Sequence, residues 1–76
     1  MTSLLQVEPG ISVQIVEIAG GEATRRRLFS LGLHIGDRIE IAARGILRGP
    51  VLVRHEGSGV TVAIGRAIAQ KIIVMV

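Results

Sequence analysis

Short apolar runs separated by turn residues are the feature of this sequence that most constrains its fold. In the run 11–15, Ile and Val alternate with Ser and Gln, which gives a strand one apolar face. Comparable strand-like runs follow at 38–43, 51–56, 60–64 and 72–76. The turn signal Glu8-Pro9-Gly10 precedes the first run, and Gly57-Ser58-Gly59 separates two later runs. The pattern therefore predicts a mainly β fold, a small SH3-like barrel of about five strands.

One short helix is expected after the first of these strands, at residues 22–31. Thr24, Leu28 and Leu31 lie on one stripe at helical spacing. Gly32 follows, and glycine commonly ends a helix in the left-handed conformation. Leu33 behind it can then contact Leu28, so the helix end is predicted to be a Schellman motif.

Two irregularities in the apolar pattern carry further predictions. The alternation slips by one residue near Ile15-Val16, which predicts a bulge or sharp bend in the first strand. The run 72–76 has no polar alternation, so we expect it to be buried on both faces or covered by a partner.

The length of 76 residues and the composition fit one domain, residues 1–76, with an aliphatic core. Phe29 is the only aromatic residue and there is no Cys, which excludes disulfides and thiolate metal sites. The first residues lack the features of a signal peptide, and no run approaches the roughly 18 apolar residues of a membrane span. We therefore expect a cytoplasmic chain without membrane insertion.

Catalytic motifs are not evident, and a metal site has only weak candidates. No Ser lies in a Gly-x-Ser-x-Gly elbow, and Gly20-Gly21 lacks the rest of a phosphate-binding loop, so no enzymatic activity is expected. The weak metal-ligand candidates are His34, Asp37, Glu40, His55 and Glu56. Their spacing is not diagnostic of a metal site. We expect no required cofactor, and weak binding of Fe²⁺ or Zn²⁺ stays open.

The run Arg25-Arg26-Arg27 is the most distinctive surface feature of the sequence. Positive charge in the early turns of a helix opposes the helix dipole and costs about 0.3 kcal/mol or more per residue. Arginine and aromatic side chains are also enriched in binding hot spots. We therefore predict a partner-binding patch, with the loop 44–48 as the next candidate. The patch consists of Arg25, Arg26, Phe29, Leu33 and His34.

Several short motifs, in this order and spacing, resemble the FeoA family over nearly the whole chain. They are Gly10, Ile18-Ala19-Gly20-Gly21, Arg26-Arg27-Leu28, Leu31-Gly32-Leu33, Ile35-Gly36-Asp37, Gly49-Pro50-Val51 and Ile72-Ile73-Val74. Ile35 stands where Pro is common in the family, and Arg48 stands where Gly is common. The resemblance implies an SH3-like barrel in the cytoplasm that acts with FeoB, a membrane iron permease with a GTP-hydrolysing domain. It also extends to the C-terminal SH3-like domains of diphtheria-toxin-repressor-type proteins.

The resemblance and the residues together favour a non-enzymatic accessory protein of ferrous iron uptake. One alternative is a nucleic-acid-binding SH3-like domain, although a single aromatic residue offers almost no stacking platform for bases. Another is a small metal-binding iron chaperone, which the weak ligand set disfavours. The sequence leaves the oligomeric state open.

Overall fold

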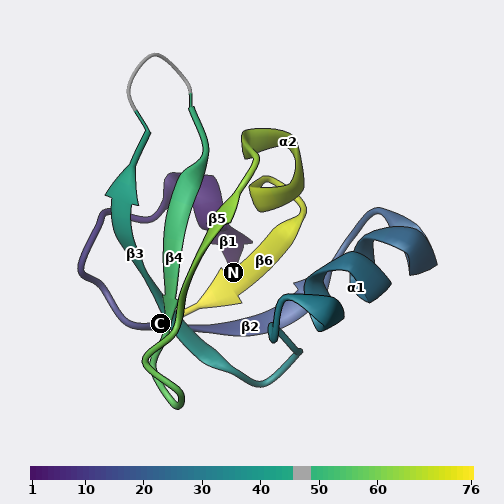
Figure 1. Ribbon diagram of the computed structural model, residues 1–76, viewed down its shortest axis with the longest axis horizontal. Coiled ribbons are helices and arrows are strands. Elements are labelled where there is room, and N and C mark those ends of the chain that lie inside the picture. Colours follow the sequence, from purple (N-terminus) through teal and green to yellow (C-terminus); the bar gives the residue numbers. More distant parts are fainter. Residues whose placement is uncertain (46–48) are drawn as a thin grey trace.

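A curled antiparallel sheet forms most of the molecule in the computed structural model, which describes residues 1–45 and 49–76 (Figure 1). The strands are β1 (Thr2–Ser3), β2 (Val13–Ile18), β3 (Arg38–Arg44), β4 (Val51–His55), β5 (Thr61–Ile64) and β6 (Ile72–Met75). Their order across the sheet is β1-β6-β2-β3-β4-β5. The predicted mainly β fold is confirmed, with six strands rather than about five in the described residues. The sheet is not closed, so β1 and β5 remain its edges.

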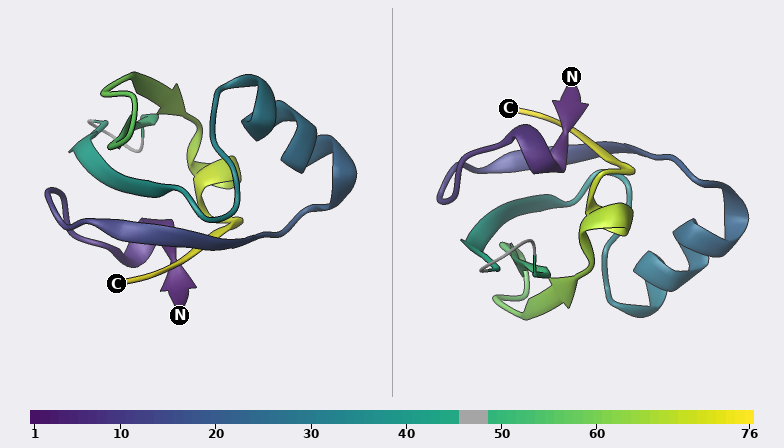
Figure 2. Two further views of the ribbon diagram at one scale, coloured as in Figure 1. Left: turned by 90° about the horizontal axis from the view of Figure 1, so that it is seen from below. Right: turned by 90° about the horizontal axis from the view of Figure 1, so that it is seen from above.

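Three helical segments accompany the sheet. They are the 3₁₀ turn η1 (Leu4–Gln6), helix α1 (Gly21–Ser30) and the single-turn helix α2 (Arg66–Ala69). The main helix follows β2, as the sequence predicted, and it stands out from the side of the sheet (Figures 1 and 2). None of the helices in the described residues is long and apolar enough to cross a membrane.

The core is aliphatic and lies on the concave side of the curled sheet (Figure 2). Alternate residues of the strands point into it, because successive side chains of a strand lie on opposite faces. Its fully buried members include Ile15, Ile39, Ile41, Val51, Val53, Ile72 and Val74. From α1 only Thr24 and Leu28 are buried. The helix is therefore attached to the core by one narrow stripe.

Two register shifts bend the long strands around this core. The shift in β2 lies between Ile15 and Glu17, which confirms the predicted bulge. A second shift lies between Ile41 and Ala43 in β3, where the sequence predicted unbroken alternation. Ala43 consequently faces solvent. Bulges increase local twist, and this allows six short strands to wrap one small core.

The C-terminal strand only partly follows the prediction of two covered faces. Strand β6 lies between β1 and β2, with Ile72 and Val74 fully buried and Ile73 half-buried. Met75 and Val76 are 45% and 87% exposed, so burial on both faces within the chain does not hold for them. The inner position of β6 in the sheet accounts for the buried residues, and cover by a partner stays a prediction for the exposed ones.

The end of α1 is the predicted Schellman motif. Gly32 has φ +88°, its N–H donates to the Phe29 carbonyl at 2.9 Å, and the Leu33 N–H donates to the Leu28 carbonyl at 2.9 Å. Leu33 and Leu28 are both buried in the core. Leu31 is 38% exposed, so its predicted place on the buried stripe is wrong. The helix ends at Ser30, and the backbone turns before Leu31 reaches the core.

We expect Gly32→Val to lower the free energy of unfolding by about 1–2 kcal/mol, because a β-branched residue is strained at positive φ. Gly65→Val is a matched control: Gly65 has φ −60°, and a Cβ there meets no atom within 4 Å. Urea unfolding of both variants tests this. Equal stability of the two would contradict the strain argument.

Candidate functional site

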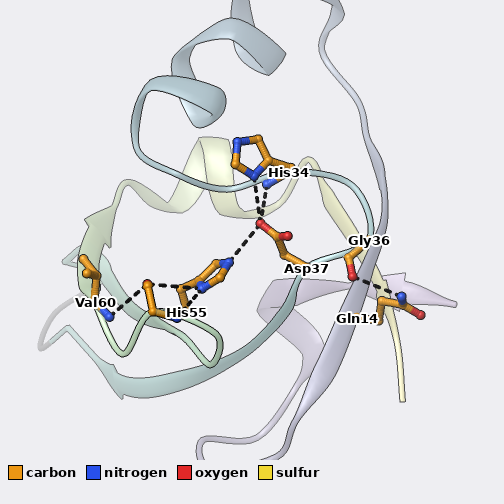
Figure 3. A network of polar contacts seen from close by, with 7 residues as sticks. Gln14, His34, Gly36, Asp37, His55 and Val60 are labelled. Atoms are coloured by element: carbon orange, nitrogen blue, oxygen red, sulfur yellow. Dashed lines mark hydrogen bonds and ion pairs between the residues drawn. The ribbon is translucent and has the colours of Figure 1, made fainter.

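The turn between α1 and β3 is fixed to strand β2 by backbone hydrogen bonds. The Gly36 N–H donates to the Ile15 carbonyl at 2.7 Å, and the Ile15 N–H donates to the Asp37 carbonyl at 2.9 Å. The side-chain amide of Gln14 donates to the Gly36 carbonyl at 3.1 Å (Figure 3). The turn thus starts from a rigid strand, and its side chains are held in defined positions.

One carboxylate oxygen of Asp37 accepts several hydrogen bonds in this turn (Figure 3). Oδ2 accepts the His34 backbone N–H at 2.9 Å and lies 3.1 Å from His34 Nδ1. It also lies 3.1 Å from His55 Nε2 at the end of β4. The Asp37 N–H donates back to the His34 carbonyl at 3.1 Å. This network therefore joins the α1–β3 turn to the β4–β5 hairpin.

The network also shifts the pKa of Asp37. Burial alone raises the pKa, but the hydrogen bonds from the His34 backbone and from the His55 and His34 rings outweigh it. The pKa of Asp37 therefore lies below its ordinary value of 3.8. The carboxylate is ionised at neutral pH and acts as an acceptor only.

The hydrogen-bond pattern assigns the tautomer of His55. Its Nδ1 accepts the Ser58 backbone N–H at 3.0 Å, so this nitrogen carries no proton. Nε2 is then the protonated nitrogen and donates to Asp37. Coordination of a metal through Nε2 would require the proton to move to Nδ1. Nδ1 could then no longer accept the hydrogen bond from the Ser58 N–H, and the two hydrogens would face each other. The turn therefore holds the His55 ring so that Nε2 donates to Asp37.

Ser58, His55 and Asp37 follow one another like a catalytic triad, but their bonds belong to the hairpin turn. The Ser58 hydroxyl lies 3.2 Å from His55 Nδ1 and accepts the Val60 N–H at 3.2 Å. The Nδ1 lone pair is already engaged by the Ser58 backbone N–H. A general base needs a free lone pair directed at the nucleophile. The arrangement closes the turn and does not activate the hydroxyl.

The structure brings together three of the predicted metal-ligand candidates, namely His34, Asp37 and His55. Glu56 is exposed and takes no part in their network. Glu40 instead accepts a hydrogen bond from Arg54 Nε at 2.7 Å on the neighbouring strand. Among residues 1–45 and 49–76, no group of three or more potential ligands is arranged to hold a metal ion. The three converging side chains satisfy one another instead.

Phe29 lies on the outer surface of α1 next to this network. Its side chain is 67% exposed, and its ring contacts the His34 ring edge-to-face with centroids 4.8 Å apart. Arg25, Phe29, His34 and the 57% exposed Ile35 line an apolar pocket of about 240 Å³ above the buried Ile18 and Leu33. An exposed aromatic residue beside an apolar pocket is a common feature of binding surfaces.

The predicted partner-binding patch is present on the surface except for one residue. Arg25, Arg26, Phe29 and His34 are exposed, whereas Leu33 is only 1% exposed and belongs to the core. The Schellman ending turns Leu33 inward. Ile35 borders the same surface and was not among the predicted residues, although an exposed apolar residue in a turn is a signal that the sequence contains. The alternative loop 44–48 lies partly outside the described residues, because 46–48 are not described.

The three consecutive arginines of α1 divide between two sides of the helix. Arg25 lines the pocket with Phe29, whereas Arg27 lines hollows toward α2 and β5, and Arg26 lies between them. Arg27 lies in the last turn, where the helix dipole favours a cation, so the predicted dipole cost does not apply to it. Within the described part of the chain, none of the three guanidinium groups forms an ion pair. Their charges are available to a partner.

We expect Asp37→Asn to lower the free energy of unfolding by about 1–3 kcal/mol near neutral pH, because three donors lose an ionised acceptor. The depressed pKa means that this contribution is present above pH 3.8 and is lost as the pH falls through the folded-state pKa. The difference between wild type and Asp37→Asn should therefore shrink on acidification. Glu56→Gln, outside the network, is the control. Urea unfolding between about pH 6 and pH 2 gives the measurement, and a pH-independent difference would contradict the assignment.

Comparison with known proteins identifies the family of this chain. The family model of the FeoA domain matches residues 2–76. A protein of Methanocaldococcus jannaschii assigned as an Fe(2+) transport protein A is 34% identical over 97% of this chain and 85% of the relative. A crystal structure of an iron uptake regulatory protein, FeoA, superposes with a TM-score of 0.85 at 31% identity, covering 97% of this chain and 93% of that chain. A manganese-dependent transcriptional repressor superposes with a TM-score of 0.86 at 27% identity, covering 96% of this chain and 35% of the repressor. With its small SH3-like fold, the chain belongs to the FeoA family.

Proposed function

We propose that this chain is a non-enzymatic accessory protein of ferrous iron uptake, working in the cytoplasm as a single domain of residues 1–76. Its partner is the cytoplasmic part of a FeoB-like iron permease that carries a GTP-binding domain. Membership of the FeoA family and a relative assigned as an Fe(2+) transport protein support the iron-uptake role. The absence of a free, activated nucleophile at Ser58–His55 supports a binding role.

The observation that carries the docking proposal is the exposed Phe29 beside unpaired arginines. We define the Phe29 patch as Arg25, Arg26, Phe29, His34 and Ile35, all of them exposed. Burying Phe29 and Ile35 against a partner supplies apolar contact, and the two arginines favour an acidic partner surface. Phe29 at 67% exposure contributes little to the core, so its presence on the surface fits binding better than folding.

The Phe29 patch is held in place before any partner arrives. The Phe29 ring contacts His34, and His34 is bonded through its backbone and its ring to Asp37. Asp37 is in turn bonded to His55 on β4. A surface fixed in this way loses less conformational entropy on binding, which raises affinity without additional contacts. Asp37 and His55 therefore support the patch through His34 without belonging to the patch themselves.

We expect Phe29→Ala to weaken binding to the permease's cytoplasmic domain by about 2 kcal/mol, roughly thirtyfold, with a much smaller change in stability. Arg25→Glu should weaken binding strongly at low salt and less at high salt, because it reverses a charge facing an acidic surface. Titration calorimetry at two salt concentrations, with urea unfolding in parallel, measures both effects.

Arg27→Glu is the matched control for this experiment, because it makes the same charge change on the other side of the same helix. Its binding should change far less than that of Arg25→Glu. Equal losses for the two variants would show that only net charge matters. Unchanged affinity for Phe29→Ala would remove the patch from the interface.

A further inference from the structure

We propose that the groove between helix α1 and strand β5 binds an extended acidic segment of a partner protein, which adds to the free edge of β5. This surface lies on the side of α1 away from Arg25 and Phe29 and shares only Arg26 with the Phe29 patch, so it goes beyond the function proposed above. The inference rests on three observations: the open backbone groups of β5, the absence of the usual protection at this edge, and the charge of the groove.

The backbone of β5 presents an open edge. Strand β5 pairs with β4 alone, with Thr61 opposite Arg54 and Ala63 opposite Leu52. The His55 N–H donates to the Val60 carbonyl at 2.8 Å, which fixes the alternation of the antiparallel ladder. Val62 and Ile64 therefore direct their N–H and C=O groups at β4, and Thr61 and Ala63 direct theirs outward. The hydrogen bonds among the described residues give those outward groups no partner.

The edge of β5 also lacks the features by which proteins usually protect an exposed strand. Natural edges carry Lys, Pro or inward-pointing charges, or a covering segment. The sequence of β5 is Thr-Val-Ala-Ile, without charge or Pro. At the other edge, β1 has only two residues. The exposed side chains of Thr61 and Ala63 are small, so a second strand can approach β5 closely.

A groove lies between helix α1 and the C-terminal end of β5. A hollow of about 320 Å³ lies between Arg27 and Ser30 of α1 and the segment Ala63–Gly65. It continues past Ile68 into a second hollow of about 540 Å³ that reaches Arg26. The residues lining the two hollows include both arginines and no acidic side chain. Arg27 thus lies beside the C-terminal end of the open edge, and Arg26 lies in the adjoining hollow. Among the described residues, neither arginine forms an ion pair.

These properties together favour an extended acidic segment as the occupant of the groove. Strand addition supplies affinity through backbone hydrogen bonds, and alternate side chains of the added strand supply specificity. Glutamate or aspartate side chains on the added strand can reach Arg27 and Arg26 and form charge-assisted hydrogen bonds. A second copy of this chain is a poorer occupant, because pairing two β5 edges would bring the two Arg27 side chains into one groove.

The test uses ¹⁵N-labelled protein and a soluble peptide in which glutamate alternates with valine. Its two comparison probes are the same peptide with lysine in place of glutamate and the same peptide N-methylated along its backbone. We expect saturable binding of the glutamate peptide only. Hydrogen exchange at the Thr61 and Ala63 amides should slow, whereas Val62 and Ile64, already bonded to β4, should not change.

Two variants test the edge and the charge separately. Ala63→Pro removes an outward N–H from an edge strand, where Pro is tolerated. In this variant, addition of the peptide should no longer slow hydrogen exchange at the Thr61 amide. Arg27→Glu should lower the affinity for the glutamate peptide by roughly tenfold. Arg25→Glu, on the other side of α1, should leave that affinity unchanged. If Ala63→Pro does not fold, the N-methylated peptide carries the same test, since it lacks the donors that strand addition needs.

Three results would overturn the proposal: equal binding of the glutamate and lysine peptides, chemical-shift changes confined to Phe29 and His34, or protection of Thr61 and Ala63 without any peptide. The last result would mean that a second copy occupies the edge, and sedimentation at several concentrations would reveal it. Loss of permease binding in Phe29→Ala with intact peptide binding would separate the two surfaces.

Discussion

Three N–H groups converge on Oδ2 of Asp37, and the position of the proposed binding surface depends on this one acceptor. Helix α1 buries only Thr24 and Leu28, too little apolar surface to fix its orientation by packing alone. The constraint comes from the end of the helix, where the Gly32 cap directs Leu33 into the core and the following turn bonds to Asp37. Because Asp37 also holds His55, helix and hairpin are fixed relative to each other.

The core depends on a small set of aliphatic residue types. Phe29, the one aromatic residue, is exposed, and the core formed by the described residues consists of Val, Ile and Leu with Ala69 and the buried Thr24. Such a core has little volume per residue, and the strands must curve tightly to enclose it. The shifts at Ile15/Glu17 and Ile41/Ala43 bend the strands around the core, and the sheet still ends at the unpaired edge of β5.

Features set by local sequence were predictable, and features set by long-range pairing were not. The helix end at Gly32 and the bulge near Ile15 follow from a few neighbouring residues, and both are confirmed. The meeting of His55 with Asp37 depends on the β3–β4 register, which places Ile39 opposite His55. No sequence spacing encodes that register. Strand β1 has two residues and no pattern to detect, so it was missed. The burial of Leu33 could have been predicted, because the Schellman motif at Gly32 already implied that Leu33 contacts the buried Leu28.

The choice of arginine on α1 bears on how the two surfaces of the helix differ. Arginine presents a planar fork that binds carboxylates in a fixed geometry, whereas lysine offers a flexible point charge. Arg25 and Arg27 have the same chemistry and stand two positions apart, yet their surroundings differ completely. Arg25 borders an aromatic ring and an apolar pocket, which suit a folded surface with a side chain to insert. Arg27 borders an open strand edge, which suits an extended chain. If both proposed acidic partners bind, the backbone and apolar groups around each arginine would distinguish them, because the charge is the same at both surfaces.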